Sequence, residues 1–421
     1  MSADPRTADE DPARWRMLAL LATAELLGMS SWFTATAVAP QLASMWGLGA
    51  RETGWLATSV QIGFVAGTAG AAVLSLADLV PARLYFAVCA LLAAAANASL
   101  AFAPGWRGAL AGRFLTGVFL AGVYPPAMKM IATWFRSGRG LAIGTLVGAL
   151  TIGKATPYLV HAMTGVGIRP VILTASAAAA LAGLLVLAGY REGPFPFPRR
   201  PFVWHQAALV LKDRPTRLAI GGYLGHMWEL YAMWAWTPAF ITASLAVWSA
   251  GAPAGSGVPA WTGDLLAFGA IAAGGLGCLW GGWMSDRIGR ETVVNLAMAA
   301  SGLCCLIIGW FFGASPWLLA GITWLWGFFV VADSAQFSAL VTEVAPAHAV
   351  GTALTLQTSL GFLLTMATIQ LVPEIEAATG WRWAFPILAL GPLAGILAIA
   401  RLARLRRGGA LGAAAGTGGP V

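Results

Sequence analysis

Two glutamates lie in the middle of long apolar runs, where a charge is costly. Glu25 lies about eight residues into the first run and Glu229 about twelve residues into the seventh. At a helical rise of about 1.5 Å per residue, both lie near the centre of a bilayer. A charged side chain there costs at least about 2.5–3.5 kcal/mol, so it marks a functional site. We expect one of these glutamates to carry a coupling proton; the alternative is a neutral acid that only ties helices together.

The seventh run carries a polar and aromatic face. His226, Glu229, Met233 and Trp236 recur at intervals of three and four residues, which places them on one side of a helix. We therefore expect the imidazole of His226 either to tune the pKa of the Glu229 carboxyl group or to relay its proton. We expect Trp236 to line an aromatic cavity, whereas the plain alternative is a tryptophan that faces lipid.

Two cations, Arg113 and Lys154, lie at similar depths in the fourth and fifth runs. Cations at one level of neighbouring helices form an anion site, and Tyr124 lies farther along the same side of the fourth run. Lysine also snorkels to the membrane surface, and a buried arginine also pairs with an acid. Both alternatives stay open.

In the tenth run, Asp333 and Gln336 lie about one helical turn apart. A buried acid of this kind binds a coupling ion or pairs with a cation across a cavity, so both residues are candidates for the transport site. The alternative is a polar pair that only joins two helices.

The composition excludes a chain surrounded by water. Of its 421 residues, 58% are hydrophobic and 10% are charged, whereas soluble domains carry about 25% charged residues. Apolar runs of about 20 residues recur along the whole chain, and each is long enough to cross about 30 Å of hydrocarbon. The runs lack the alternation of barrel strands, so they must be helices.

The pattern predicts an all-α integral membrane protein of twelve transmembrane helices, at 17–43, 54–77, 84–103, 107–132, 139–162, 170–190, 217–247, 262–284, 292–313, 317–343, 350–372 and 382–402. With the N-terminus inside, cytoplasmic segments hold 18 Lys and Arg residues and the opposite face holds four. The positive-inside rule then places both termini in the cytoplasm. We expect a multi-pass protein of the cell (inner or plasma) membrane.

The longest polar interruption carries four prolines and divides the chain near its middle. We therefore expect two similar six-helix bundles with pseudo-twofold symmetry, joined by a linker in which 202–211 forms an interfacial helix. The predicted parts are a cytoplasmic N-terminal tail (1–16), an N-terminal bundle (17–190), a cytoplasmic linker (191–216), a C-terminal bundle (217–402) and a disordered C-terminal tail (403–421).

The two halves share local sequence. The segment from Gly117 in the fourth run aligns with the segment from Gly327 in the tenth, and the segment from Gly140 aligns with that from Gly351. Duplication of a six-helix unit is typical of transporters that work by alternating access.

A loop motif follows the eighth run, reading Gly282-Trp-Met-Ser-Asp286-Arg287-Ile-Gly289-Arg290. Gly282 permits close helix packing, Gly289 permits a tight turn, and Asp286 can accept hydrogen bonds from a neighbouring helix N-terminus. The two arginines are expected to face anionic lipid or an acid such as Glu343.

This motif resembles the cytoplasmic-loop signature of the major facilitator superfamily. The resemblance implies a twelve-helix transporter fold with a gate at this loop. In the first half only Asp78 and Arg83 match the signature. Arg113-Phe-Leu-Thr-Gly117 resembles a further element of the superfamily, whose arginine faces the central cavity in many members and serves proton coupling.

We therefore expect a proton-coupled secondary transporter that moves a small, anionic solute by alternating access. Its expected partners are the solute, protons and membrane lipids, without nucleic acid, and we expect a monomer. Proton-driven efflux of amphipathic drugs is the alternative, and a transport-inactive membrane sensor or scaffold is an alternative of another class. Metal-ligand spacings, phosphate loops and catalytic groupings are missing from the sequence, so we expect no enzyme activity, no cofactor and no metal.

Overall fold

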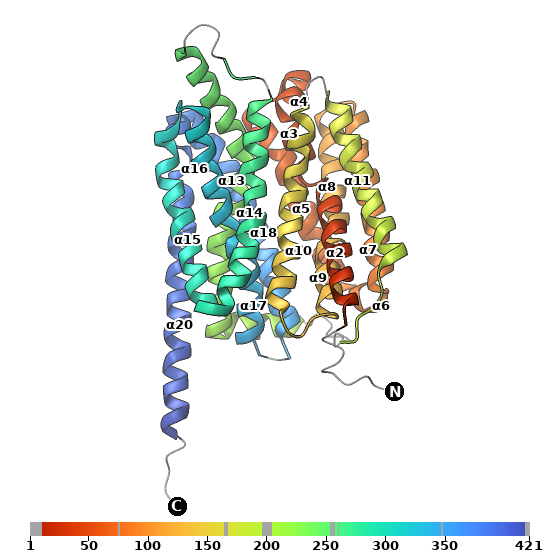
Figure 1. Cartoon of the computed structure of the whole chain (residues 1–421), viewed down its shortest axis with the longest axis vertical. Helices are drawn as coiled ribbons and strands as arrows, with labels where there is room; N and C mark the ends of the chain where they lie inside the picture. Colours follow the sequence, from red (N-terminus) through yellow and green to blue (C-terminus); the bar gives the residue numbers. More distant parts are fainter. Residues whose placement is uncertain are drawn as a thin grey trace, which may run out of the picture.

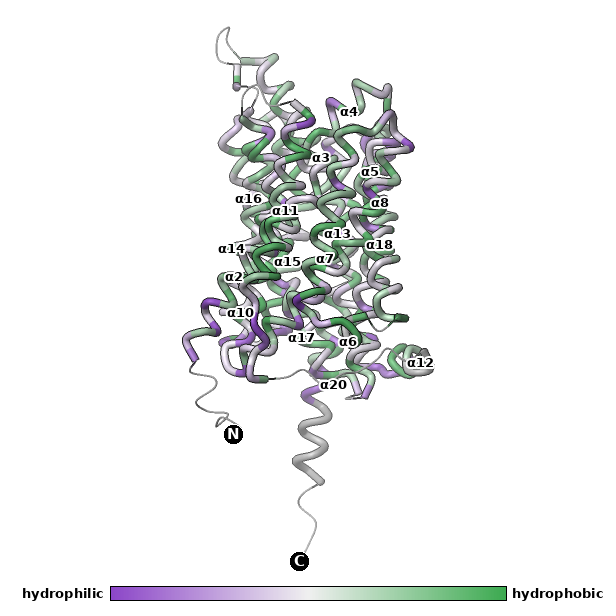
Figure 2. Tube along the Cα trace, turned by 90° about the vertical axis from the view of Figure 1, so that its right-hand side faces the viewer, coloured by the Kyte–Doolittle hydropathy of each residue, from purple (hydrophilic) through white to green (hydrophobic). Residues whose placement is uncertain are grey.

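The computed structural model describes residues 11–74, 76–163, 167–195, 204–252, 257–259, 261–346 and 348–416. In these ranges the chain forms helices and no strands, and eleven helices are long and apolar enough to cross a membrane. The helices stand side by side, and α2 begins at the same end of the molecule where α20 finishes (Figure 1). Hydrophilic residues gather towards the two ends of the bundle, as expected for a membrane-spanning protein (Figure 2).

The first half of the sequence forms α2 (Ala13–Met29), α3 (Thr34–Ala37), α4 (Ala39–Trp46), α5 (Ala50–Val73), α6 (Leu76–Leu79), α7 (Ala82–Ser99), α8 (Trp106–Leu120), α9 (Tyr124–Ala132), α10 (Arg139–His161) and α11 (Ile168–Gly189). The remainder forms α12 (Trp204–Lys212), α13 (Arg214–Gly251), α14 (Thr262–Ile288), α15 (Arg290–Ile307), α16 (Pro316–Ala332), α17 (Ser334–Val344), α18 (Val350–Thr379), α19 (Trp381–Ala384) and α20 (Leu390–Gly416). The 3-10 turns η1 (Leu100–Phe102), η2 (Ile308–Phe311) and η3 (Pro386–Ala389) lie at helix ends.

The segment predicted as one helix over 17–43 is interrupted. Helix α2 ends at Met29, and the short helices α3 and α4 continue the chain after a turn. Serine hydroxyls compete with helical hydrogen bonds, and here the Ser30 hydroxyl donates to the Leu27 carbonyl at 2.6 Å. This turn leaves main-chain carbonyl groups free to accept hydrogen bonds from side-chain donors.

Two aligned helices break at aligned positions. The fourth predicted helix divides into α8 and α9 just before Tyr124, and the tenth divides into α16 and α17 at Asp333. Upstream of each break, a glycine lies against the backbone of another helix: a methyl group on Gly117 would lie 2.1 Å from the Val60 carbonyl oxygen, and one on Gly327 would lie 1.6 Å from that of Ala270. The sequence alignment of the halves therefore coincides with matching local structure.

Helices α10 and α14 pack closely along their length and join the two halves of the sequence. A methyl group on Gly148 would lie 2.9 Å from the Gly275 carbonyl oxygen, and one on Gly144 would lie 3.0 Å from that of Cys278. Small residues at such a crossing let two backbones approach and pack without side chains between them.

The last helix is longer than expected. Helix α20 continues to Gly416, whereas we predicted a disordered tail from residue 403. Residues 403–407 are alanine, leucine and arginine, which favour helix, and Arg406 is fixed by ion pairs with Glu291 at 2.6 Å and Glu343 at 3.2 Å. A helix is present where we expected one over 202–211, as α12 from Trp204, and residues 202 and 203 lie outside the described ranges.

Replacing Gly327 with alanine is expected to destabilise the protein. The new methyl group meets the α14 backbone, and overpacking of this kind costs about 1–3 kcal/mol. Gly321 in the same helix has open space at this position, so Gly321→Ala is the matched control. The melting temperature of the purified protein should fall for Gly327→Ala and hold for Gly321→Ala; equal melting temperatures would contradict this packing.

Candidate substrate and coupling site

A cavity of about 70 Å³ lies between helices from the two halves of the chain. It is lined by Met29, Trp32, Phe64, Tyr124, Val147, Leu150, Thr151, Lys154, Tyr223, His226, Met227, Leu230, Tyr231, Trp234, Val331, Ser334, Ser338, Thr358 and Phe362. These described residues include one lysine and no carboxylate. The lining is therefore apolar, aromatic and hydroxyl-bearing around a single ammonium group.

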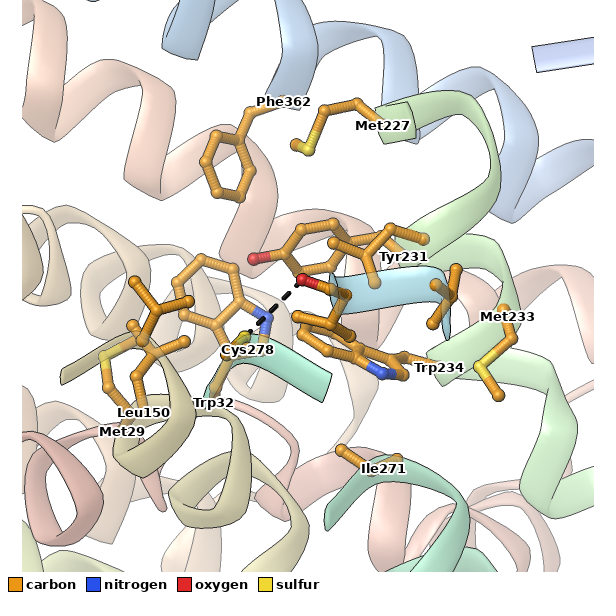
Figure 3. Packing of buried hydrophobic residues seen from close by; sticks show 14 of the residues in the cluster. Met29, Trp32, Leu150, Met227, Tyr231, Met233, Trp234, Ile271, Cys278 and Phe362 are labelled. Carbon is orange, nitrogen blue, oxygen red and sulfur yellow. Dashed lines mark hydrogen bonds between the residues drawn. The ribbon is translucent and has the colours of Figure 1, made fainter. Parts of the chain in front are cut away.

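Lys154 lies inside a cage of aromatic rings. Its side chain is 2% exposed, and its Nζ donates to the Tyr231 hydroxyl at 2.6 Å. The same Nζ lies 4.3 Å from the ring centroid of Trp32, 4.7 Å from that of Tyr231 and 4.9 Å from that of Trp234. Figure 3 shows these three rings grouped together. Lys154 thus faces the cavity and does not snorkel to the membrane surface, since cation–π contacts stabilise it where it is.

The cage continues into a layer of rings that joins the two halves. Trp32 contacts Phe64 at 5.2 Å between centroids, and Phe64 contacts Phe362 at 4.6 Å. Tyr231 lies 5.7 Å from Trp32 and 5.2 Å from Phe362. Aromatic pairs at such distances are attractive beyond their buried area. The layer therefore holds helices of both halves together beside the cavity.

Glu25 lies on α2 close to Lys154. Its side chain is fully buried, and among the described residues neither carboxyl oxygen has a hydrogen-bond partner. Lys154 and Tyr124 lie within electrostatic range of the carboxyl. Gly153 brings the helices together, because a methyl group there would lie 2.2 Å from the Leu26 carbonyl oxygen. Glu25 is thus an unpaired buried acid beside the cavity's ammonium group.

Glu229 is held differently and does not line the cavity. Its carboxylate accepts hydrogen bonds from the Trp326 indole at 2.5 Å, the Ser301 hydroxyl at 2.9 Å and the Cys305 thiol at 3.2 Å. These donors belong to α15 and α16. The carboxylate therefore binds three helices of the second half together.

His226 partners Asp333 and Ser334 instead of Glu229. Its Nδ1 lies 2.9 Å from Asp333 Oδ1, although the two atoms are not aligned as a hydrogen bond, and its Nε2 lies 2.9 Å from the Ser334 hydroxyl. His226 and Ser334 reach the cavity, while Asp333 supports them from the break between α16 and α17. Gln336 accepts a hydrogen bond from Arg290 at 2.6 Å and so contacts the loop motif of residues 282–290, which we name the inner loop after its predicted cytoplasmic position.

Arg113 fixes the interruption of the first helix. It is fully buried, and its guanidinium donates to the carbonyl oxygens of Ser31, at 2.9 Å, and Trp32, and to Asn97 Oδ1 at 2.8 Å. The structure therefore does not bring Arg113 and Lys154 into one anion site. Arg113 holds the backbone of Trp32, and Lys154 faces the ring of the same residue.

The inner loop motif joins α14 to α10 and α17. Gly289 has φ 86°, a left-handed conformation that favours glycine. A methyl group on Gly140, in the first turn of α10, would lie 3.6 Å from both carboxylate oxygens of Asp286, so the acid faces a helix N-terminus as expected. Arg290 Nε donates to Glu343 at 2.8 Å.

The remaining loop residues have other surroundings. Arg287 lies 3.5 Å from the centroid of the Trp283 ring. In the first half, Arg83 is exposed, and the side chain of Asp78 lies outside what the structure describes.

At the opposite end of α10, a second set of contacts links the halves. His161 Nδ1 lies 2.9 Å from Asp264 Oδ2, and its Nε2 lies 2.5 Å from the Gln41 amide nitrogen. Trp236 also belongs to this region: its indole donates to the Ile369 carbonyl at 2.7 Å and it does not line the cavity. We name His161, Asp264 and Gln41 the outer contact, after the side of the membrane that the predicted orientation gives them.

Sequence reasoning missed Trp32, Tyr231 and Asp264 as site residues. Tyr231 lies three residues before Trp234, and this spacing puts the two rings on one helix face. Asp264 lies at the beginning of an apolar run, where an acid is also expected for the helix dipole alone. Trp32 was not predicted as a site residue because its segment was expected to form one continuous helix.

The fold and the cavity define a multi-pass membrane transporter. Residues 20–369 match the family model of the Major Facilitator Superfamily, and the chain belongs to this superfamily. Its members carry small molecules across membranes.

A solved structure with a similar fold is that of a bacterial homologue of the human lysosomal transporter Spinster, in an inward-facing and occupied conformation. The TM-score is 0.66 at 15% sequence identity, covering 94% of this chain and 97% of that one. At this identity the likeness shows the fold alone. No curated protein sequence matches the chain.

Replacing Arg113 with glutamine is expected to destabilise the fold as well as reduce activity. The carbonyls of Ser31 and Trp32 lose a charged donor, and each such bond contributes about 1.5–3 kcal/mol. The exposed Arg107 on the same helix provides the control Arg107→Gln. Thermal unfolding should show a large loss for Arg113→Gln only; an Arg113→Gln protein as stable as wild type would argue against this clamp.

Proposed function

We propose that the chain is a proton-coupled secondary transporter that moves a small anionic solute by alternating access. The observation that carries this proposal is the ammonium group of Lys154, buried in a cavity between the two halves and lined by no described carboxylate. Glu25, the acid beside it, forms no hydrogen bond with the ammonium group, and a buried charge without a directly bonded carboxylate is costly. An anionic solute supplies that directly bonded partner.

In this proposal the chain spans the membrane twelve times in two six-helix bundles, with both termini in the cytoplasm. Helix α2, extended by α3 and α4, makes the first span beside the eleven longer helices. Two helix breaks, before Tyr124 and at Asp333, occur at matching positions, and each follows a tightly packed glycine in the sequence. This match supports a duplicated bundle. The excess of Lys and Arg on one face supports the orientation.

Charge balance links the solute to a proton. In this proposal Glu25 is ionised when no solute is bound, because its carboxylate and the Lys154 ammonium group attract each other between the closely packed helices α2 and α10. When an anion binds Lys154, Glu25 becomes a second negative charge in a buried site, and taking up a proton restores neutrality. Anion and proton then move together.

The geometry favours Glu25 over Glu229 as the group that carries the proton. Glu25 has no hydrogen-bond partner among the described residues, so a proton can come and go without breaking a network. Glu229 is engaged by three donors away from the cavity. We propose that Glu229 holds α13, α15 and α16 together.

Alternating access requires contacts between the halves at both ends of the cavity. The outer contact joins His161 and Gln41 to Asp264, and at the inner end Asp286 faces the first turn of α10. Each set has to separate when the cavity opens on its side. We propose that these two sets alternate.

Glu25→Gln is expected to abolish proton uptake on solute binding, whereas Glu229→Gln is expected to retain it. The test adds nitrate, isobutyrate, glucose or tetraphenylphosphonium to weakly buffered protein in detergent and follows a pH dye. Wild-type protein should take up about one proton with the anion it binds, since Glu25 is the unpaired acid beside Lys154. Uptake that persists in Glu25→Gln would refute the assignment, and proteoliposomes without flux of any solute would favour a transport-inactive protein.

Asp264→Asn is expected to weaken the outer contact and favour opening at that end. A partly exposed ion pair contributes at most about 1 kcal/mol, so the open population should rise by up to about fivefold. Spin labels at Arg51→Cys and Thr379→Cys report the separation of α5 and α18. The exposed acid Glu374 provides the control Glu374→Gln; identical distance distributions in Asp264→Asn and this control would contradict the outer contact.

A further inference from the structure

We infer that the solute is a short organic monocarboxylate, an inference that rests on the proposed function because it assigns the chemistry of the same cavity. Four properties of the cavity carry it: the number of charges, the aromatic cage around Lys154, the scarcity of polar lining groups and the volume. Each excludes a different class of solute.

The charge of the lining fits one negative charge. Lys154 is its one lysine, and the described lining contains no arginine and no acid. His226, the remaining basic group, is engaged by Asp333 and Ser334. An ammonium acts as a single point charge, unlike the two-pronged guanidinium. A dianion would therefore keep one charge buried without a partner, which is strongly unfavourable.

The cage also argues against a cationic solute. An aromatic cage binds an organic ammonium by cation–π attraction, but here the rings of Trp32, Tyr231 and Trp234 already surround the Nζ of Lys154. A cation that enters the cavity meets the positive charge of Lys154, and the acid beside it, Glu25, is not among the lining residues. The site therefore repels amphipathic cations.

Most of the cavity lining is apolar or aromatic, and several of its hydroxyl groups are engaged by the protein itself. The lining includes Met29, Phe64 and Leu150 beside the rings of the cage. Among its hydroxyl groups, that of Tyr231 accepts from Lys154 and that of Thr151 donates to the Val147 carbonyl at 2.8 Å. An inorganic oxyanion presents oxygen in every direction, so it loses hydrogen bonds against apolar walls. A carboxylate presents oxygen at one end and carbon at the other, which matches this lining.

The volume limits the size of the carbon skeleton. At about 70 Å³ the cavity is far smaller than the roughly 300–1,000 Å³ of pockets for drug-sized ligands. The solute therefore has only a few carbon atoms, packed against methionine, valine, leucine and aromatic side chains. Its charge and size together define a short-chain monocarboxylate.

The test compares solutes of one shape and different charge. Isobutyrate, isobutyramide and isobutyramidinium share a skeleton, nitrate is a compact inorganic anion, and succinate is a dianion. Each is titrated against purified full-length protein while the melting temperature is recorded, because a ligand stabilises the state that it binds. Isobutyrate should stabilise the protein with saturation, and the other four should bind at least about tenfold more weakly.

Two variants test the role of the cage. Lys154→Met keeps the length and burial of the side chain and should lose the isobutyrate effect. Tyr231→Phe keeps the ring and frees the ammonium from the hydroxyl, so isobutyrate should bind at least as tightly as in wild type. If Lys154→Met does not fold, Tyr231→Phe provides the test. Loss of isobutyrate binding in Tyr231→Phe would overturn the inference.

The outcomes separate this inference from the proposed function. Stronger stabilisation by nitrate, succinate or isobutyramidinium, no stabilisation by isobutyrate, or an isobutyrate effect that survives Lys154→Met overturns the solute class. Proton uptake that accompanies a different solute leaves the transport function standing. Isobutyrate binding without proton uptake supports the solute class and refutes proton coupling.

Discussion

The structure depends most on the placement of one ammonium group at the boundary between two halves of a membrane protein. Lys154 comes from α10, while the hydroxyl and two of the three rings around it come from α13. The contact is therefore both a binding feature and a tie between the halves. An anion that competes with Tyr231 for the ammonium group weakens the contact between α10 and α13. Solute binding and separation of these helices therefore both depend on the Lys154–Tyr231 interaction.

Glycine backbone contacts make this placement possible. Lys154 lies next to Gly153, which brings α10 against α2 and its Glu25. On another side of the same helix, Gly148 meets Gly275 and brings α10 against α14. Without a hydrophobic driving force in lipid, close packing of small residues stabilises such crossings. The helix that carries the cation is thus fixed by its neighbours through its backbone, which leaves its polar side chains available to the cavity.

Hydropathy and periodicity predicted most of the fold, because each apolar run is long enough to be read locally. Loop chemistry was also readable: Gly289 has the left-handed φ that its turn required, and Arg290 faces Glu343. The site was harder to predict. Glu229 and Glu25 look alike in sequence, and only tertiary contacts show that one has three donors and the other none among the described residues. The turn before Phe33 was not predicted because its two serines, without a proline, do not by themselves interrupt an apolar run that is long enough to cross the bilayer.

That turn has an electrical consequence. Arg113 binds the carbonyl oxygen of Trp32 and Lys154 faces the indole of the same residue, so two buried positive charges contact different groups of one residue. The guanidinium group meets a carbonyl oxygen and the ammonium group meets an indole ring, both of which are electron-rich. These two contacts let like charges coexist in a medium of low polarity. One tryptophan in a broken helix therefore separates a cation with a structural role from a cation that remains free to exchange its partner.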